Sequence, residues 1–325
     1  MENDKILEIK DLFVKFPMDG GAINAVNGVN LSLGKGETLG VVGESGCGKS
    51  VTMSTILRLV KTPPARIEGE IYYKGQNILD MPMRDFTRIR GKEISMIFQE
   101  PMTSLDPVIK IGPQIAESLM LHEKLLKNAA MAKALELLKQ VEIPNAEKRI
   151  NDYPHQLSGG MRQRVMIAMA LACKPQILLA DEPTTALDVT IQAQIMDLIK
   201  KLRGEYGMSI MIVTHDLGVI SDVADRVVVF YSGQIVEEAR TADLFKHPKP
   251  PYTKGLLACI PTLQTKAQRL QVIEGNIADP ANRPSGCPFH PRCRYATERC
   301  RKENPKLYPC GDGHMAACHL MEDNG

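Results

Sequence analysis

The stretch Gly43-Glu44-Ser45-Gly46-Cys47-Gly48-Lys49-Ser50 decides the fold of this chain, because it is a complete phosphate-binding loop. The apolar run before it, Glu37–Gly43, is typical of a buried strand, and Ser50–Leu57 is typical of the start of a helix. A phosphate loop needs this strand-to-helix turn, since its glycines allow positive φ and its N–H groups attract an anion. The sequence therefore predicts an α/β fold with a phosphate site at this turn.

Each position of the loop has a predicted contact with a bound nucleotide, which we expect to be ATP with Mg²⁺. The Lys49 ammonium would reach the β- and γ-phosphates, and the Ser50 hydroxyl would bind Mg²⁺. Cys47 fills a variable position, where its backbone N–H matters more than its thiol. The predicted nucleotide contacts are Gly43, Glu44, Ser45, Gly46, Cys47, Gly48, Lys49, Ser50 and Val51.

An apolar run that ends in two carboxylates, Gln176–Pro183, is typical of a central parallel strand whose carboxyl end faces a ligand. Asp181 is the expected partner of the magnesium shell, and Glu182 is the expected base that polarises an attacking water. A solvated acidic turn is the weaker interpretation, because both residues follow a buried strand downstream of a complete phosphate loop. The pair favours hydrolysis of the nucleotide.

The segment Leu157-Ser158-Gly159-Gly160-Met161 predicts a second anion site. Ser158 is a good N-cap, and the residues from Met161 to Ala172 are strong helix formers. Ser158, Gly159 and Gly160 would therefore present hydroxyl and N–H groups at the positive end of a helix. Two phosphate sites built on different surfaces do not easily close on one nucleotide within a monomer.

Taken in order, these motifs resemble those of an ABC-type ATPase subunit, and the resemblance covers roughly residues 5 to 245. It implies a head-to-tail dimer, with ATP between the phosphate loop of one subunit and Ser158–Gly160 of its partner. The family's usual residue after the two glycines is Gln, whereas this chain has Met161. Because that side chain is not the expected anion donor, we expect function to survive the departure.

The same resemblance assigns four further residues. Phe16 takes the place of the aromatic that stacks on adenine, and Gln99 matches the glutamine of the Q-loop. Asp188 ends the D-loop Ala186-Leu187-Asp188, and His215 matches the switch histidine, which holds the γ-phosphate. The implied catalytic residues are Glu182, His215 and Gln99, and the implied Mg²⁺ ligands are Ser50, Gln99 and Asp181.

Length and composition describe an ordinary globular protein. The chain has 325 residues, of which 44% are hydrophobic, and a formal net charge of +2. It has neither basic tracts nor basic-aromatic alternation, which argues against nucleic acid as a partner. No signal peptide is recognisable at the amino terminus, and no run approaches the ~18 apolar residues of a membrane span. We therefore expect a cytoplasmic chain that is soluble by itself, and the resemblance to transporter ATPases implies a peripheral location on the cytoplasmic face of the cell membrane.

The chain is expected to have two domains. Residues 1–245 form the predicted nucleotide-binding domain, a mixed sheet with an antiparallel N-terminal β-subdomain over Ile6–Leu33 and a helical subdomain over about residues 100–172. A hairpin is predicted about Ser232-Gly233. After residue 245 the composition shifts to prolines, arginines and cysteines, so residues 246–325 form a predicted small cysteine-rich extension.

Two segments are similar to the oligopeptide and dipeptide importer branch of the family. They are Gln99–Pro107, near the groove where the family receives a helix of its membrane partners, and the tail segment His247–Leu257. The branch implies an ATPase that energises peptide import as a translocase subunit. Its partners would be a second ATPase subunit (a paralogue or a copy), two membrane permeases and, indirectly, an extracytoplasmic substrate-binding protein. From its residues alone, Gln99–Pro107 is a surface loop rich in turn formers.

The tail also holds most of the cysteines. Of the eight in the chain, five are tail residues, namely Cys287, Cys293, Cys300, Cys310 and Cys318. Disulfides are typical of secreted chains, so a metal site is the preferred interpretation here. The gaps of five and six residues that follow the first two of these cysteines suit zinc poorly, since zinc ribbons pair cysteines two to four residues apart. The pattern alone leaves a choice between Cys310 and Cys318.

The importer branch implies an iron–sulfur cluster, [4Fe–4S], in this tail. The implied ligands are Cys287, Cys293, Cys300 and Cys318, with Cys310 as the spare. Zinc and free thiols are the alternatives. We expect a cluster to be structural, clamping a small domain that is too short to build its own core.

Three classes of function fit the sequence. The leading one is an ATP-hydrolysing subunit of a peptide importer, with import of another small solute, such as nickel, glutathione or an oligosaccharide, as its alternative. A soluble ATPase that acts on ribosomes or DNA is less favoured, because the chain has one cassette and no sustained heptads. An iron–sulfur redox-regulated ATPase is the third. Neither the cargo nor the identity of the second ATPase subunit follows from the sequence.

Overall fold

The computed structural model describes residues 5–18, 21–185, 187–259, 273–277 and 281–322. The chain divides into two compact units, residues 1–79 with 213–325 and residues 80–212. The predicted domain boundary near residue 245 is not one of these limits and stays a prediction. Over the described ranges, no helix combines the length and the apolar character that crossing a bilayer requires.

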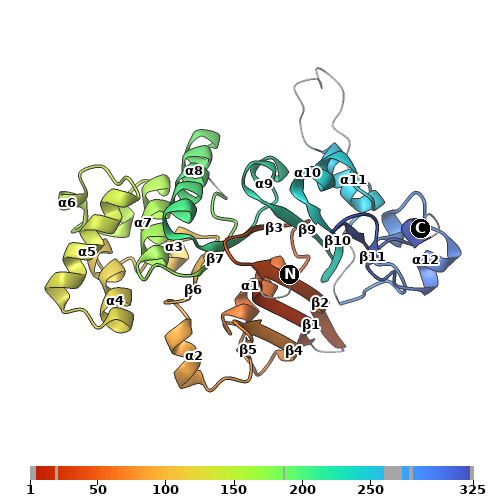
Figure 1. Cartoon of the computed structure of the whole chain (residues 1–325), viewed down its shortest axis with the longest axis horizontal. Helices are drawn as coiled ribbons and strands as arrows, with labels where there is room; N and C mark the ends of the chain where they lie inside the picture. Colours follow the sequence, from red (N-terminus) through yellow and green to blue (C-terminus); the bar gives the residue numbers. More distant parts are fainter. Residues whose placement is uncertain (1–4, 19–20, 186, 260–272, 278–280, 323–325) are drawn as a thin grey trace. The chain divides into compact units, whose positions relative to one another are not determined.

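An antiparallel sheet forms one layer of the first unit, as the N-terminal sequence predicts (Figure 1). Its strands run in the order β2-β1-β4-β5. Along β1, Leu12 and Val14 are fully buried while Phe13 between them is half-buried, the period-two pattern of a sheet with one face on the core. The strands are β1 (Lys5–Met18), β2 (Gly21–Gly34), β4 (Arg66–Tyr73) and β5 (Gln76–Asn77).

A second sheet of this unit carries the phosphate loop. β3 (Thr38–Val42) is buried along its whole length and pairs in parallel with β9 (Arg226–Tyr231), which pairs with β10 (Gln234–Arg240) in the antiparallel direction. Ser232 and Gly233 have φ of 47° and 77°, so the predicted hairpin turns through a left-handed loop. The C-terminal strands β12 (Met315–Ala316) and β11 (Tyr308–Pro309) continue the sheet from β10.

Buried charges hold the ends of these strands together. The Arg226 Nε donates to Glu37 Oε1 at 2.8 Å, and its Nη1 pairs with the Glu238 carboxylate, which fixes the start of β3 against β9 and β10. Glu237 is fully buried, and its Oε1 lies 2.7 Å from His314 Nε2 and accepts from the Lys249 N–H at 2.8 Å. The tail is thereby fastened to β10.

The helices of the first unit are mostly short. They are α1 (Lys49–Ile56), α9 (Leu217–Val223), α10 (Thr241–Lys246), α11 (Pro251–Ala258), α12 (Glu298–Lys302) and α13 (His319–Glu322). A 3₁₀ turn spans His290–Arg292.

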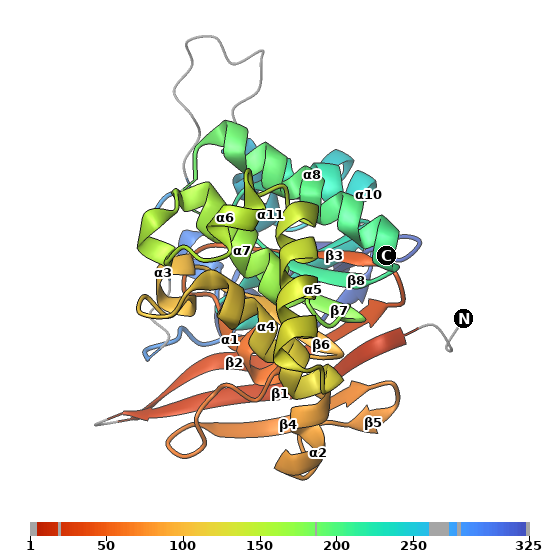
Figure 2. The same ribbon diagram turned by 90° about the vertical axis from the view of Figure 1, so that its left-hand side faces the viewer.

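The second unit combines parallel strands with most of the longer helices (Figure 2). β6 (Ile94–Ile97), β7 (Ile177–Asp181) and β8 (Ser209–Val213), which ends at the limit of the unit, are buried at every position, with β7 between the other two. The helical segment expected over residues 100–172 is present as α3 to α7. The helices are α2 (Met83–Ile89), α3 (Pro101–Ser104), α4 (Ile111–Glu123), α5 (Lys127–Gln140), α6 (Ala146–Arg149), α7 (Gly159–Leu171) and α8 (Val189–Tyr206).

Candidate functional site

The phosphate loop lies between β3 and α1, and its glycines are sterically required. Gly43, Gly46 and Gly48 have φ of 149°, 75° and 101°, the region that side chains rarely adopt. A Cβ added at Gly43 would lie 2.3 Å from the Phe230 carbonyl oxygen, and one at Gly48 would lie 2.3 Å from the Ala25 carbonyl oxygen. The loop therefore packs against its surroundings as bare backbone, which leaves its N–H groups as its phosphate-binding surface.

Lys49 folds back over the loop. Its side chain donates to the carbonyl oxygens of Gly43 at 2.8 Å and Glu44 at 2.9 Å, and the residue is only 5% exposed. A positive charge thus lies at the centre of a ring of peptide groups, as an ATP site requires. Ser50, which follows on α1, is exposed.

Cys47 lies inside the loop as a neutral packing group. The residue is 1% exposed, and burial raises the pKa of its thiol. Its Sγ is 3.5 Å from Lys49 Nζ, and its carbonyl oxygen accepts from the Gly233 N–H at 2.9 Å. The backbone role that the sequence predicts for Cys47 is consistent with this position.

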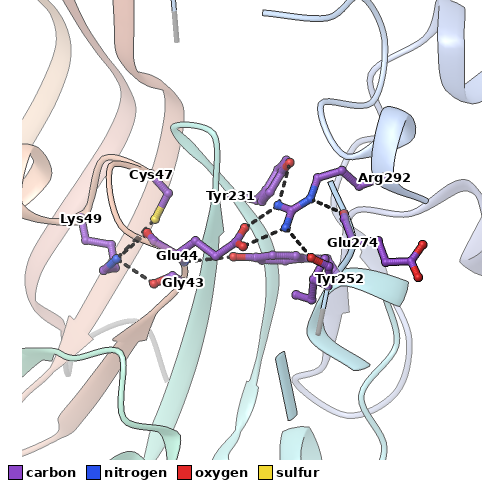
Figure 3. Close-up of polar contacts among 9 residues, drawn as sticks. Gly43, Glu44, Cys47, Lys49, Tyr231, Tyr252, Glu274 and Arg292 are labelled. Atoms are coloured by element: carbon purple, nitrogen blue, oxygen red, sulfur yellow. Dashed lines mark hydrogen bonds and ion pairs between the residues drawn. The ribbon is translucent and has the colours of Figure 1, made fainter. Parts of the chain in front are cut away.

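Glu44 is held by two residues that sequence reasoning did not select (Figure 3). The Arg292 guanidinium donates to its carboxylate at 2.7 and 3.0 Å, and the Glu44 N–H donates to the Tyr252 hydroxyl at 3.1 Å. Both partners lie in the C-terminal region, 248 and 208 positions away along the chain. No local sequence pattern signals such a contact; the only indication is an unexplained acidic residue beside a phosphate site.

In the second unit, the ends of two parallel strands bring Gln99 to Glu182. Ile97 on β6 is in register with Ala180 on β7, so the residues that follow both strands meet at one edge. Gln99 Nε2 donates to Glu182 Oε2 at 2.9 Å, and Thr185 Oγ1 donates to the same oxygen at 2.7 Å. Asp181, the other acidic residue, is 6% exposed at the end of β7.

Ser158 caps α7, which begins at Gly159, so the predicted N-cap is confirmed. The Ser158 Oγ accepts from the Met161 N–H at 3.3 Å, and the residue is exposed. Gly160 is required by packing, since an added Cβ would lie 2.8 Å from Ile191 Cγ2 on α8. The Ser158 hydroxyl and the first N–H groups of α7 therefore lie at a solvent-accessible helix end.

The remaining predicted residues occupy ends of elements. Asp188 caps α8, because its Oδ1 accepts from the Ile191 N–H at 2.9 Å; Ala186 of the same motif is outside the described residues. His215 follows β8 and is exposed. Phe16 is half-buried on β1, opposite Ile23 of β2. The phosphate loop, Phe16 and His215 belong to the first unit, and the other predicted residues of the ATP site belong to the second.

Four of the five tail cysteines line one cavity of about 40 Å³ in the first unit; they are Cys287, Cys293, Cys300 and Cys318. Its other lining residues include Phe289 and Tyr252. Burial raises the pKa of the Cys287 thiol to about 11. Cys310 is not part of this lining, and its N–H donates instead to the His314 carbonyl oxygen at 2.7 Å.

Among the residues that the structure describes, no three His, Cys, Asp or Glu side chains are grouped closely enough to hold a single metal ion. A tetrahedral zinc ion, with Zn–S bonds of about 2.3 Å, would draw its thiolates into such a group. The described residues therefore show no ready-made metal-binding group, for zinc or for a cluster.

Comparison with protein families gives two matches. Residues 26–185 match the model described as "ABC transporter", and residues 236–300 match "Oligopeptide/dipeptide transporter, C-terminal region". Among curated proteins, the oligopeptide transport ATP-binding protein OppD of Bacillus subtilis is 50% identical over 98% of this chain and 89% of its own length. OppD of Haemophilus influenzae is 46% identical over 98% of each chain.

Solved structures of ATP-binding cassettes share the fold. The cassette MJ0796, solved as a dimer bound to ADP and Pi, has a TM-score of 0.65 and 34% sequence identity over 72% of this chain and 98% of its own. CbiO1 from Clostridium perfringens, part of the transporter complex CbiONQ, has a TM-score of 0.63 and 26% identity over 75% of this chain and 92% of its own. Both solved chains leave about a quarter of this chain uncovered.

Proposed function

We propose a nucleotide-sandwich mechanism for this chain, which belongs to the ABC transporter family and is the ATP-hydrolysing subunit of a peptide importer. Near full-length similarity to peptide-import ATP-binding proteins carries the assignment to peptides. In the proposed mechanism, ATP binds the phosphate loop of one subunit and is covered by Ser158–Gly160 of a second subunit. The solvent-accessible, serine-capped start of α7 is the observation that carries this arrangement.

Binding of ATP would rest on the residues that the sequence predicts for it. The loop N–H groups and Lys49 would hold the phosphates, and Phe16 would stack on adenine. Ser50, Gln99 and Asp181 would hold Mg²⁺, which supplies charge neutralisation at the β- and γ-phosphates when it is bound. His215 would contact the γ-phosphate, and Asp188 would lie near the partner subunit.

Glu182 would be the base for the attacking water. Its Oε2 accepts hydrogen bonds from Gln99 and Thr185, and these two donors fix the orientation of the carboxylate. Since Gln99 begins the segment that the family presents to its membrane partners, the contact joins the base to that segment. Peptide transport and ATP hydrolysis would be coupled through this pair.

The proposed partners are a second ATPase subunit and two membrane permeases, which would hold this chain on the cytoplasmic face of the membrane. A substrate-binding protein outside the membrane would act on this subunit only through the permeases. Gln99–Pro107, which includes the short helix α3, is the proposed contact with a permease. No nucleic acid is part of the proposal.

We also propose that the four cavity cysteines hold an iron–sulfur cluster, [4Fe–4S]. The donor set supports the proposal, because four thiols line one small cavity. The same lining supports Cys318, and not Cys310, as the fourth ligand. The cluster would add a covalent crosslink to a segment of short helices and strands.

Substitution of the base tests the mechanism. In the assembled importer, Glu182→Gln is expected to lower ATP hydrolysis by about 100-fold or more, because the attacking water loses its base. Binding of the fluorescent analogue mant-ATP should persist, and uptake of labelled peptide should stop. Glu136→Gln, an exposed residue of α5, is the matched control and should behave as wild type. Unchanged hydrolysis by Glu182→Gln would remove Glu182 from its proposed role.

Anaerobic purification tests the cluster. Wild-type protein should show visible iron–sulfur absorbance with iron and acid-labile sulfide near four per chain, and Cys318→Ser should lose most of it. Cys310→Ser is the control and should keep the full absorbance. If Cys310→Ser loses the absorbance and Cys318→Ser keeps it, Cys310 and not Cys318 is the fourth ligand. If the protein contains stoichiometric zinc and no sulfide, the metal is zinc and the cluster proposal is wrong.

A further inference from the structure

Glu44 is the second residue of the phosphate loop, at a position where the loop's backbone matters and the side chain is variable. Here the side chain is fully engaged. Arg292 Nη1 donates to its Oε2 at 2.7 Å and Nη2 donates to its Oε1 at 3.0 Å, a bidentate pair of the strongest kind (Figure 3). A carboxylate next to a phosphate site would repel the nucleotide, and this pairing neutralises it.

The pair is sheltered from water and geometrically fixed. The Arg292 side chain is 5% exposed and that of Glu44 is 20% exposed. The guanidinium also donates through Nε to the Glu274 carbonyl oxygen at 3.0 Å and through Nη1 to the Tyr231 hydroxyl at 3.5 Å. Because each guanidinium nitrogen has an acceptor, the side chain of Arg292 is held in one orientation. The fixed guanidinium in turn fixes the position of the Glu44 carboxylate.

A second contact fixes the backbone of the same residue. The Glu44 N–H donates to the Tyr252 hydroxyl at 3.1 Å, and the Glu44 carbonyl oxygen accepts from Lys49 Nζ at 2.9 Å. The peptide groups on both sides of Glu44 are thus held, one by the C-terminal region and one by the lysine that would bind phosphate. A shift of Glu44 would therefore shift Lys49.

The residues that hold Glu44 also border the cysteine-lined cavity. Tyr252 is one of its lining residues, and Arg292 directly precedes Cys293. Tyr231, Tyr252 and Phe289 form a packed aromatic trio, with ring centroids 4.6 to 5.3 Å apart, and Phe289 lines the same cavity. The cavity and the phosphate loop are joined by rigid, buried side chains, all within the first unit.

We infer that Arg292 and Tyr252 are positioning residues of the ATP site, which preorganise the phosphate loop and make its affinity for ATP depend on the cysteine-lined cavity. Neither residue would touch the nucleotide; both act through Glu44 and, beyond it, Lys49. The inference rests on ATP binding at the phosphate loop, as proposed above. It is independent of the cargo, since it concerns nucleotide affinity alone.

The first test measures mant-ATP affinity of the purified full-length chain. Arg292→Met removes the bidentate ion pair and leaves the negative charge of Glu44 beside the phosphates. The Kd for mant-ATP is therefore expected to rise about tenfold. Arg292→Lys, which keeps the charge, should recover part of the affinity. Arg294→Met is the matched control, because Arg294 is exposed and its guanidinium lies over the Tyr295 ring.

Three further measurements distinguish a positioning role in the ATP site from a merely structural role. In the assembled importer, Arg292→Met should raise the KM for ATP about tenfold while kcat at saturating ATP changes less than about threefold. Glu44→Gln should cancel most of the Arg292→Met effect, because the unpaired charge is then gone. Tyr252→Phe, which removes one hydroxyl and keeps the ring, should raise the Kd about threefold even if the arginine variant folds poorly.

The cavity is tested by Cys318→Ser, with Cys310→Ser as its control outside the cavity. The first is expected to raise the Kd for mant-ATP at least about threefold, and the second to leave it unchanged. Values within twofold of wild type for Arg292→Met and Tyr252→Phe would overturn the positioning role, and an unchanged Kd in Cys318→Ser would overturn the dependence on the cavity. Failure of the wild-type chain to bind mant-ATP would instead overturn the proposed function.

Discussion

The phosphate loop Gly43–Ser50 is fastened by residues from distant parts of the chain, whereas Ser158 is held through the first turn of its own helix. Lys49 is 5% exposed, and the loop contacts Tyr252, Arg292 and the β9–β10 turn. Ser158 is exposed, with its hydroxyl engaged by the first turn of α7. The comparison teaches that the phosphate loop is fixed by contacts within the chain, while the start of α7 is exposed, as the proposed contact with a partner's nucleotide requires.

The largest expected effect is on the loop itself. Lys49→Met should weaken binding of mant-ATP to the isolated chain by about 100-fold or more, because the only cation folded into the loop over the described residues is removed. Lys35→Met, an exposed lysine that precedes β3, is the control. An affinity within threefold of wild type would show that the first site is not completed by its own chain.

A smaller effect is expected at Gly160. Gly160→Ala places a Cβ against Ile191 on α8, so the start of α7 must move. ATP hydrolysis by the assembled importer should fall about tenfold, while mant-ATP affinity of the isolated chain should stay within twofold.

The double variant Gly160→Ala with Ile191→Ala relieves the contact and should recover most of the hydrolysis. A loss of affinity in the isolated chain would break the comparison, because Ser158–Gly160 would then serve its own chain's nucleotide.

The smallest expected effect comes from Ser158→Ala, which removes a helix cap worth about 1 kcal/mol. Hydrolysis in the assembled importer should fall about fivefold, again with unchanged affinity in the isolated chain. Ser158→Asp sharpens the comparison, because aspartate caps a helix as well as serine but repels phosphate. If Ser158→Asp hydrolyses ATP as fast as wild type, the residue is a cap and not an anion contact.

Local chemistry was readable in the sequence. The phosphate loop, the acidic end of β7 and the cap of α7 each depend on residues that are close together along the chain, so spacing and residue type were sufficient to predict them. The antiparallel N-terminal sheet and the hairpin at Ser232-Gly233 were predicted for the same reason.

Contacts between distant segments could not be predicted from the sequence. The hydrogen bond from Gln99 to Glu182 depends on the register of β6 with β7, and the Glu44–Arg292 pair spans 248 positions. Spacing also left Cys310 and Cys318 open, and only the lining of the cavity separates them.

The Glu44–Arg292 pair makes two positions that are far apart in the sequence depend on each other in evolution. A chimera that received its C-terminal region from another ATPase would need an arginine at 292, or an uncharged residue at 44, to avoid a buried carboxylate without its cation. Because loss of one partner leaves the charge of the other unpaired, the two positions are expected to change together as related transporters diverge. The C-terminal region of this subunit therefore cannot be exchanged freely between relatives, because it must match the residue at position 44 of the phosphate loop.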